Sequence, residues 1–176
     1  MREYYYLIAS LPMLEFGTKM PISYVDFLKR SREQLESADM GIIERIKTGP
    51  FEDTEDPSPT FKEWKLFARA LRNEIARYRA ARTGKDPLEH IRGGNYPDPF
   101  VSGFAHWAVH EDSPIEAELY LDRARWEKIE ELEKGHYFDI DFLVTYALKL
   151  QILERWDRIN SEGGMALLQA LLSESA

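Results

Sequence analysis

Two histidines are spaced so that they could bind a divalent metal ion together. His106 and His110 are four residues apart, and Glu111 follows the second histidine. On a helix this spacing places both imidazoles on one face, as the binding of a divalent metal requires. The segment lacks the glutamate that follows the first histidine in zinc-peptidase helices, and no third ligand is identifiable. We therefore interpret the pair as two ordinary histidines and keep a small metal-dependent enzyme as an alternative function.

Asp122 is the carboxylate with the most unusual predicted surroundings. It lies between Leu119 and Trp126, at helical spacing on an apolar stripe. A buried carboxylate requires a partner, and we expect a cation or an amide on a neighbouring helix, with Arg72 and Asn73 as first candidates. A catalytic role would require a second carboxylate or a base beside it, and the sequence shows no such set.

Charge is distributed unevenly between two predicted helices. Residues 60–82 contain seven basic and two acidic residues, whereas residues 113–134 contain seven acidic and four basic residues. The basic helix could be a docking surface for an acidic partner or RNA, but we favour ion pairing between the two helices, where exposed pairs add ~0–1 kcal/mol each. The candidates for contact with a partner protein are Arg69, Arg77 and Arg79, together with Tyr4, Tyr5 and Tyr6 at the aromatic N-terminus.

The composition argues against several function classes. The 176 residues carry a formal net charge of −8 and contain no cysteine. The acidic balance argues against nucleic acid as the main partner, and the lack of cysteine excludes disulfides and thiolate nucleophiles. No Gly-rich phosphate loop and no Ser-His-Asp signature is recognisable, so we expect no cofactor.

The hydrophobic pattern predicts no membrane insertion. No segment approaches the ~18 consecutive apolar residues that indicate a membrane-spanning helix. The first residues lack the apolar core and cleavage site of a signal peptide. We expect a cytoplasmic protein that reaches a membrane only through partner proteins.

Helical periodicity predicts an all-α fold. Amphipathic patterns indicate helices at residues 40–47, 60–82, 113–134 and 138–160, with a further helix opened by Ser23 and a short helical or irregular segment at 100–110. At residues 113–116, Ser-Pro-Ile-Glu combines a cap, an N1 proline and a capping-box glutamate. Residues 4–11 form either one minor strand or a short helix, because so brief an aromatic run fits both.

The pattern also predicts how the chain is divided. We expect an N-terminal aromatic segment and helix pair at residues 1–50, an acidic, proline-punctuated linker at 51–59 and a main helical body at 60–176, which together form one compact unit. Residues 70–75 and 147–152 both follow the pattern Ala-Leu-basic-x-Glu/Gln-Ile. Such an echo suggests a repeated helical unit.

Several stretches carry a set of short residue patterns. They are Tyr-Tyr-Tyr-Leu at 4–7, Pro-Ile-Ser-Tyr-Val-Asp-Phe-Leu at 21–28, Ile-Ile-Glu-Arg-Ile at 42–46 with Phe51, Leu-Arg-Asn at 71–73, and Ile-Glu at 115–116 with Leu-Asp at 121–122. Together these stretches resemble a bacterial family that is encoded beside V-type ATPase subunits. Residues 146–156 resemble the recurring helix of that family again, with Leu150 in the place of Asn73. That family in turn resembles the C/d subunit, the socket between the central stalk and the membrane ring.

The resemblance implies a non-catalytic subunit or an accessory or assembly factor that couples the central stalk to the membrane ring. Its implied partners are stalk and ring subunits, and it implies no cofactor. The C/d fold is a funnel of three helical repeats, and a chain of 176 residues holds roughly half of it. A minimal socket, a regulatory factor and an assembly factor therefore all stay open. A helical adaptor with no ATPase link is a further alternative.

Overall fold

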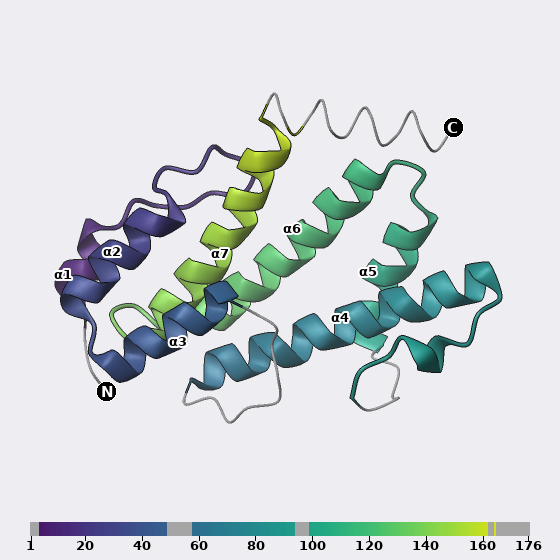
Figure 1. The fold of residues 1–176 in the computed structure, drawn as a ribbon, viewed down its shortest axis with the longest axis horizontal. Helices are drawn as coiled ribbons and strands as arrows, with labels where there is room; N and C mark the ends of the chain where they lie inside the picture. Colours follow the sequence, from purple (N-terminus) through teal and green to yellow (C-terminus); the bar gives the residue numbers. More distant parts are fainter. Residues whose placement is uncertain (1–3, 49–57, 94–98, 162–163, 165–176) are drawn as a thin grey trace. The chain divides into compact units, whose positions relative to one another are not determined.

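The computed structural model describes residues 4–48, 58–93, 99–161 and 164. All regular secondary structure in these ranges is helical, which confirms the predicted all-α fold class (Figure 1). None of the described helices combines the length and the apolar character that crossing a lipid bilayer requires. The elements are α1 (Tyr5–Ser10), α2 (Tyr24–Gln34), α3 (Ser37–Thr48), α4 (Pro59–Thr83), the 3-10 turn η1 (Pro87–Glu89), α5 (Pro99–His110), α6 (Pro114–Glu133) and α7 (Ile140–Ile159).

The aromatic N-terminal segment forms helix α1, so the alternative of a minor strand is wrong. Tyr5 and Tyr6 are exposed, whereas the next two residues, Leu7 and Ile8, are both buried. Adjacent side chains of a strand point to opposite faces. Two exposed residues followed by two buried residues therefore fit a helix and not a strand.

The chain divides into two compact units, and one of them is discontinuous in sequence. Unit 1 contains Met1–Glu52 and Gly135–Ala176, and unit 2 contains Asp53–Lys134. The predicted linker at 51–59 lies beside the first division, although only Ser58 and Pro59 of it are among the described residues. The second division splits the predicted main body of residues 60–176, because α7 packs with the N-terminal helices α2 and α3.

Helix α7 holds unit 1 together. Its Tyr146 ring packs on Phe27 of α2, with centroids 5.3 Å apart, and the Tyr146 hydroxyl donates to the Pro12 carbonyl at 2.9 Å. On α3, the Ile46 carbonyl accepts a hydrogen bond of 2.7 Å from the Gln151 amide of α7. Helix α7 is thus tied to segments more than 100 residues away in the sequence.

The described residues of unit 2 form α4, η1, α5 and α6, and α5 packs on both α4 and α6. Ser58 caps the start of helix α4, where its hydroxyl accepts from the Phe61 amide at 3.0 Å. Gly84 caps the end of the helix, and its φ of 64° suits glycine. Helix α6 starts as predicted, with the Ser113 hydroxyl accepting from the Glu116 amide at 3.3 Å. Local capping chemistry therefore sets these helix boundaries.

Candidate functional site

Asp122 is fully buried, but the predicted partners are wrong. Its carboxylate oxygen lies 2.6 Å from the Nη1 atom of Arg125, three residues further along the same helix, α6. Arg125 also approaches Glu118 at 3.7 Å. Arg72 is exposed, and the amide of Asn73 is used elsewhere. Asp122 thus neutralises a cation of its own helix, which supports a structural role.

Asn73 holds the loop after α4 against that helix. Its side-chain nitrogen donates to the Arg92 carbonyl at 2.9 Å, and its side-chain oxygen accepts from the Arg92 amide at 3.1 Å. Both polar atoms of a side chain that is only 7% exposed are therefore satisfied. The two bonds fix the backbone of Arg92 against α4.

The arginines that were predicted to contact a partner do not share one environment. Arg79 is exposed and Arg69 is half-buried, packed over Gly93. Arg77 instead lies 3.1 Å from the buried Glu74 as an ion pair along α4, and its Nη2 atom is buried without a hydrogen-bond partner among the described residues. Arg77 is therefore unsuited to meet a partner protein.

The ion pairs described for α4 and α6 lie within each helix. They join Glu74 to Arg77 on α4, and Asp122 to Arg125 and Glu131 to Lys128 on α6. The predicted pairing between the two helices is not among them. Side chains three residues apart on one helix reach one another more directly than side chains on separate helices.

The histidine pair of α5 is exposed and packs on α4. The His106 and His110 rings have centroids 4.3 Å apart, and both rings make edge contacts with Tyr78. His110 Nδ1 lies 2.7 Å from the His106 carbonyl oxygen, so one ring nitrogen of the pair is already engaged. In the part of the chain that the structure describes, no third ligand joins these two histidines to form a metal-binding group.

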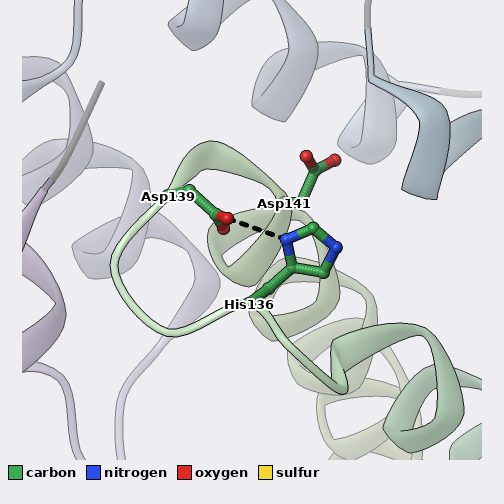
Figure 2. Close-up of side chains that lie close together, drawn as sticks. All are labelled: His136, Asp139 and Asp141. Atoms are coloured by element: carbon green, nitrogen blue, oxygen red, sulfur yellow. Dashed lines mark hydrogen bonds and ion pairs between the residues drawn. The ribbon is translucent and has the colours of Figure 1, made fainter. Parts of the chain in front are cut away.

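A different cluster has the composition of a metal site, and the sequence analysis missed it. His136, Asp139 and Asp141 at the start of α7 place three ligand atoms within 4.8 Å of one another (Figure 2). Asp139 is buried. The signal that could have found the cluster is the spacing His-x-x-Asp-x-Asp around a helix start.

The cluster is already used as a helix cap. One Asp139 oxygen lies 2.7 Å from His136 Nδ1, as Figure 2 shows, and the other accepts from the Phe142 amide at 3.0 Å. The partial positive charge of a helix N-terminus favours carboxylates and disfavours a bound cation. A metal here would need His136 and Asp139 to exchange these bonds for coordination, so the geometry favours capping over metal binding.

Among the described residues of unit 1, four exposed aromatic side chains lie on two segments that are distant in sequence. Tyr6 is 88% exposed and Tyr137 is 69% exposed, whereas Tyr5 and Phe138 are exposed to 47% and 41%. The Tyr5 and Phe138 rings lie 4.5 Å apart between centroids, and the Tyr4 amide donates to the Phe138 carbonyl. We call Tyr5, Tyr6, Tyr137 and Phe138 the aromatic surface.

Tyr4 differs from its two neighbours. Its ring is buried and its hydroxyl donates to the Asp39 carboxylate of α3. Of the three predicted aromatic contact residues, only Tyr5 and Tyr6 are therefore accessible, and Tyr4 anchors α1 to the rest of unit 1.

Comparison with known proteins gives one partial match. The model of a family described as Protein of unknown function (DUF2764) matches residues 105–175. The match covers the end of α5 and all of α6 and α7, including the cluster at the start of α7. No curated protein and no solved structure matches the chain.

Proposed function

We propose that this chain is a non-catalytic, partner-binding component of a V-type ATPase. It would serve as an accessory or assembly factor, or as a small subunit between the central stalk and the membrane ring, held at the cytoplasmic face through other proteins. The observation that carries partner binding is the aromatic surface. The ATPase setting rests on the resemblance of residues 4–7, 21–28 and 71–73, among others, to the family encoded beside ATPase subunits.

The chemistry of the aromatic surface suits protein binding. Tyrosine and phenylalanine bury a large area with few rotatable bonds, and tyrosine adds a hydroxyl that can hydrogen-bond at an interface. Such residues dominate the binding energy of many protein interfaces. The Tyr5–Phe138 contact and the Tyr4 amide bond join the two segments, so the surface is organised before a partner arrives.

The direct test is a tagged pull-down from solubilised membranes of the native host, at low and at high salt. We expect ATPase stalk or ring subunits at both salt concentrations, because contacts made by aromatic side chains are not screened by ions. Recovery at low salt alone would indicate a transient factor held by charge. Absence of ATPase subunits under both conditions would contradict the ATPase proposal.

Paired variants test whether the aromatic surface is the contact. The double variant Tyr6→Ala/Tyr137→Ala removes the two most exposed rings of that surface, and we expect recovery of ATPase subunits to fall by roughly tenfold or more. The matched control is Met13→Ala/Val25→Ala, which removes exposed apolar side chains of the same unit. Equal loss in both variants would argue against a defined aromatic contact.

A further inference from the structure

Helix α4 separates its charges by sign around the helix axis. Five cations, which we call the cationic stripe, fall within one arc of about 100° when each residue turns the helix by about 100°. They are Lys62, Lys65, Arg69, Arg72 and Arg79. Both glutamates of the helix, Glu63 and Glu74, lie outside this arc.

Three members of the stripe have no internal partner. Lys62, Arg72 and Arg79 are exposed, and none of them forms an ion pair among the described residues. Lys62 and Arg79 are 17 positions apart on α4, or about 25 Å along the helix axis. These three exposed cations concentrate positive charge on one face of α4, in a chain of net charge −8.

Among the described residues, no ion pair joins Lys62, Arg72 or Arg79 to a neighbouring helix. The carboxylates of α6 that form described ion pairs do so with Arg125 and Lys128 of α6 itself. The other two arginines of α4 are engaged away from the stripe: Arg77 pairs with Glu74, and Arg82 donates to the Val109 carbonyl of α5. Lys62, Arg72 and Arg79 are therefore the exposed members of the stripe for which the described residues provide no ion pair.

We infer that the cationic stripe binds an acidic, helical face of a partner protein. Carboxylates at three- and four-residue spacing on a partner helix would repeat at the same interval as these cations. Arginine presents a fork of donors that matches a carboxylate. Leu66, which is 49% exposed beside the stripe, adds an apolar contact of the kind that protein interfaces use.

Nucleic acid is the less favourable occupant of the same surface. The net charge of −8 repels a polyanion at long range, and the stripe offers no exposed ring on which a base could stack. The inference specifies the chemistry of a partner and rests on the proposed partner-binding function for its biological setting.

The experiment uses the full chain and defined probes. Binding is measured by fluorescence anisotropy to a synthetic helical peptide with glutamates at three- and four-residue spacing on one face, and to the same peptide with glutamine in place of glutamate. Duplex DNA and vesicles containing phosphatidylserine serve as the competing polyanions. We expect the glutamate peptide to bind, and its affinity to fall as salt is added.

Charge reversal locates the binding surface. The variant Lys62→Glu/Arg72→Glu/Arg79→Glu should bind the glutamate peptide at least roughly tenfold more weakly than the unmodified chain. The control Lys19→Glu/Lys29→Glu/Lys85→Glu makes the same change in net charge at exposed positions outside the stripe, and should stay within about threefold. Circular dichroism and thermal unfolding establish that both variants are folded.

Three results would overturn the inference: equal binding of the glutamine peptide, an equal loss in the control variant, or tighter binding of DNA or vesicles than of the glutamate peptide.

The pull-down separates this inference from the proposed function. If the unmodified chain recovers ATPase subunits and the stripe variant recovers as many, the inference fails and the proposed function stands. If the unmodified chain recovers none, the ATPase proposal fails and the peptide measurements alone decide the inference.

Discussion

Helices α4 and α7 contain the same short sequence pattern, the echo at residues 70–75 and 147–152, but its side chains differ greatly in solvent exposure between the two helices. In α7 the residues 143–150 are all buried, including Lys149 at 8% exposure. In α4 the corresponding basic residue, Arg72, is exposed, and the next position is Asn73, which binds a loop. The echoed pattern specifies a helix in both units, but the neighbours of each helix decide which face stays accessible. Unit 1 uses its copy as a central packing element, whereas unit 2 leaves a charged face open.

The largest effect on stability is expected from exchanging the residue that follows the basic residue of the echo, which is Leu150 in α7 and Asn73 in α4. Leu150→Asn places an amide at a fully buried site of α7 and should lower the free energy of unfolding by about 3–5 kcal/mol. The reciprocal change Asn73→Leu loses two hydrogen bonds to Arg92 and should cost about 1–2 kcal/mol. Urea unfolding followed by circular dichroism measures both. Equal costs would show that the two helices are packed alike, and would break the comparison.

A second prediction compares ion pairs of the two units. Asp122→Ala in unit 2 leaves Arg125 without its fully buried partner, and we expect a loss of about 3 kcal/mol in unfolding free energy. Glu154→Ala in unit 1 removes a Lys47 pair whose side chains are 38% and 24% exposed, and should cost less than about 1 kcal/mol. An unchanged melting temperature for Asp122→Ala would refute the structural role of that carboxylate.

Alkaline pH should act on unit 1 through two buried tyrosines. Burial raises the pKa of Tyr146 to about 12 from its ordinary value of 10.0, against a smaller lowering effect of Arg30. Burial, assisted by Glu154, also raises the pKa of Tyr24. Because the folded state holds these protons more tightly, their contribution to stability is complete below pH 10 and is lost as the pH rises toward about 12.

Tyrosinate absorbance and circular dichroism, recorded together as the pH is raised, should therefore show late ionisation accompanied by loss of helix. Tyr146→Phe removes one of the two ionisations and should make unfolding less dependent on pH in that range, while costing about 1 kcal/mol at neutral pH through the lost bond to Pro12. An identical pH profile for this variant would exclude Tyr146 as a source of the alkaline loss.

The smallest effect is expected at the basic position of the echo. Arg72→Ala changes an exposed side chain and should alter the free energy of unfolding by less than about 0.5 kcal/mol. Lys149→Ala removes a buried aliphatic stem and should cost about 1–2 kcal/mol. Thermal unfolding of both variants gives the comparison directly. A larger loss at Arg72 would mean that the stripe stabilises the fold, and would weaken its assignment as a binding surface.

Local features of the fold could be predicted from the sequence because their chemistry is local. The start of α6 follows from Ser113, Pro114 and Glu116, and the apolar positions of α4 follow from its periodicity. The predicted Asp122 partner failed because burial was taken to require another helix. A long arginine side chain three residues away supplies the charge within one helix.

Other features depend on contacts between distant segments. Nothing in the apolar pattern of α7 distinguishes packing against α2 and α3 from packing against α4, so the discontinuous unit was not predictable. The cluster of His136, Asp139 and Asp141 was visible as a spacing, but its capping role depends on where α7 begins. The sequence does not show which arginines of α4 are exposed and which are half-buried. This depends on the Glu74 side chain, which pairs with Arg77, and on the loop that places Gly93 beside Arg69.

The discontinuity of unit 1 has a consequence for synthesis on the ribosome. Helices α2 and α3 are made early, but α7, which supplies much of their packing surface, is made after the whole of unit 2. Unit 2 can therefore complete α4, α5 and α6 first, whereas Phe27 of α2 lacks its contact with Tyr146 until residues 140–159 have emerged. Protease digestion of ribosome-bound chains stalled before α7 would reveal the order as a protected unit 2 and a cleavable N-terminal segment. We therefore expect the apolar side chains of the nascent N-terminal segment to stay exposed until α7 has emerged.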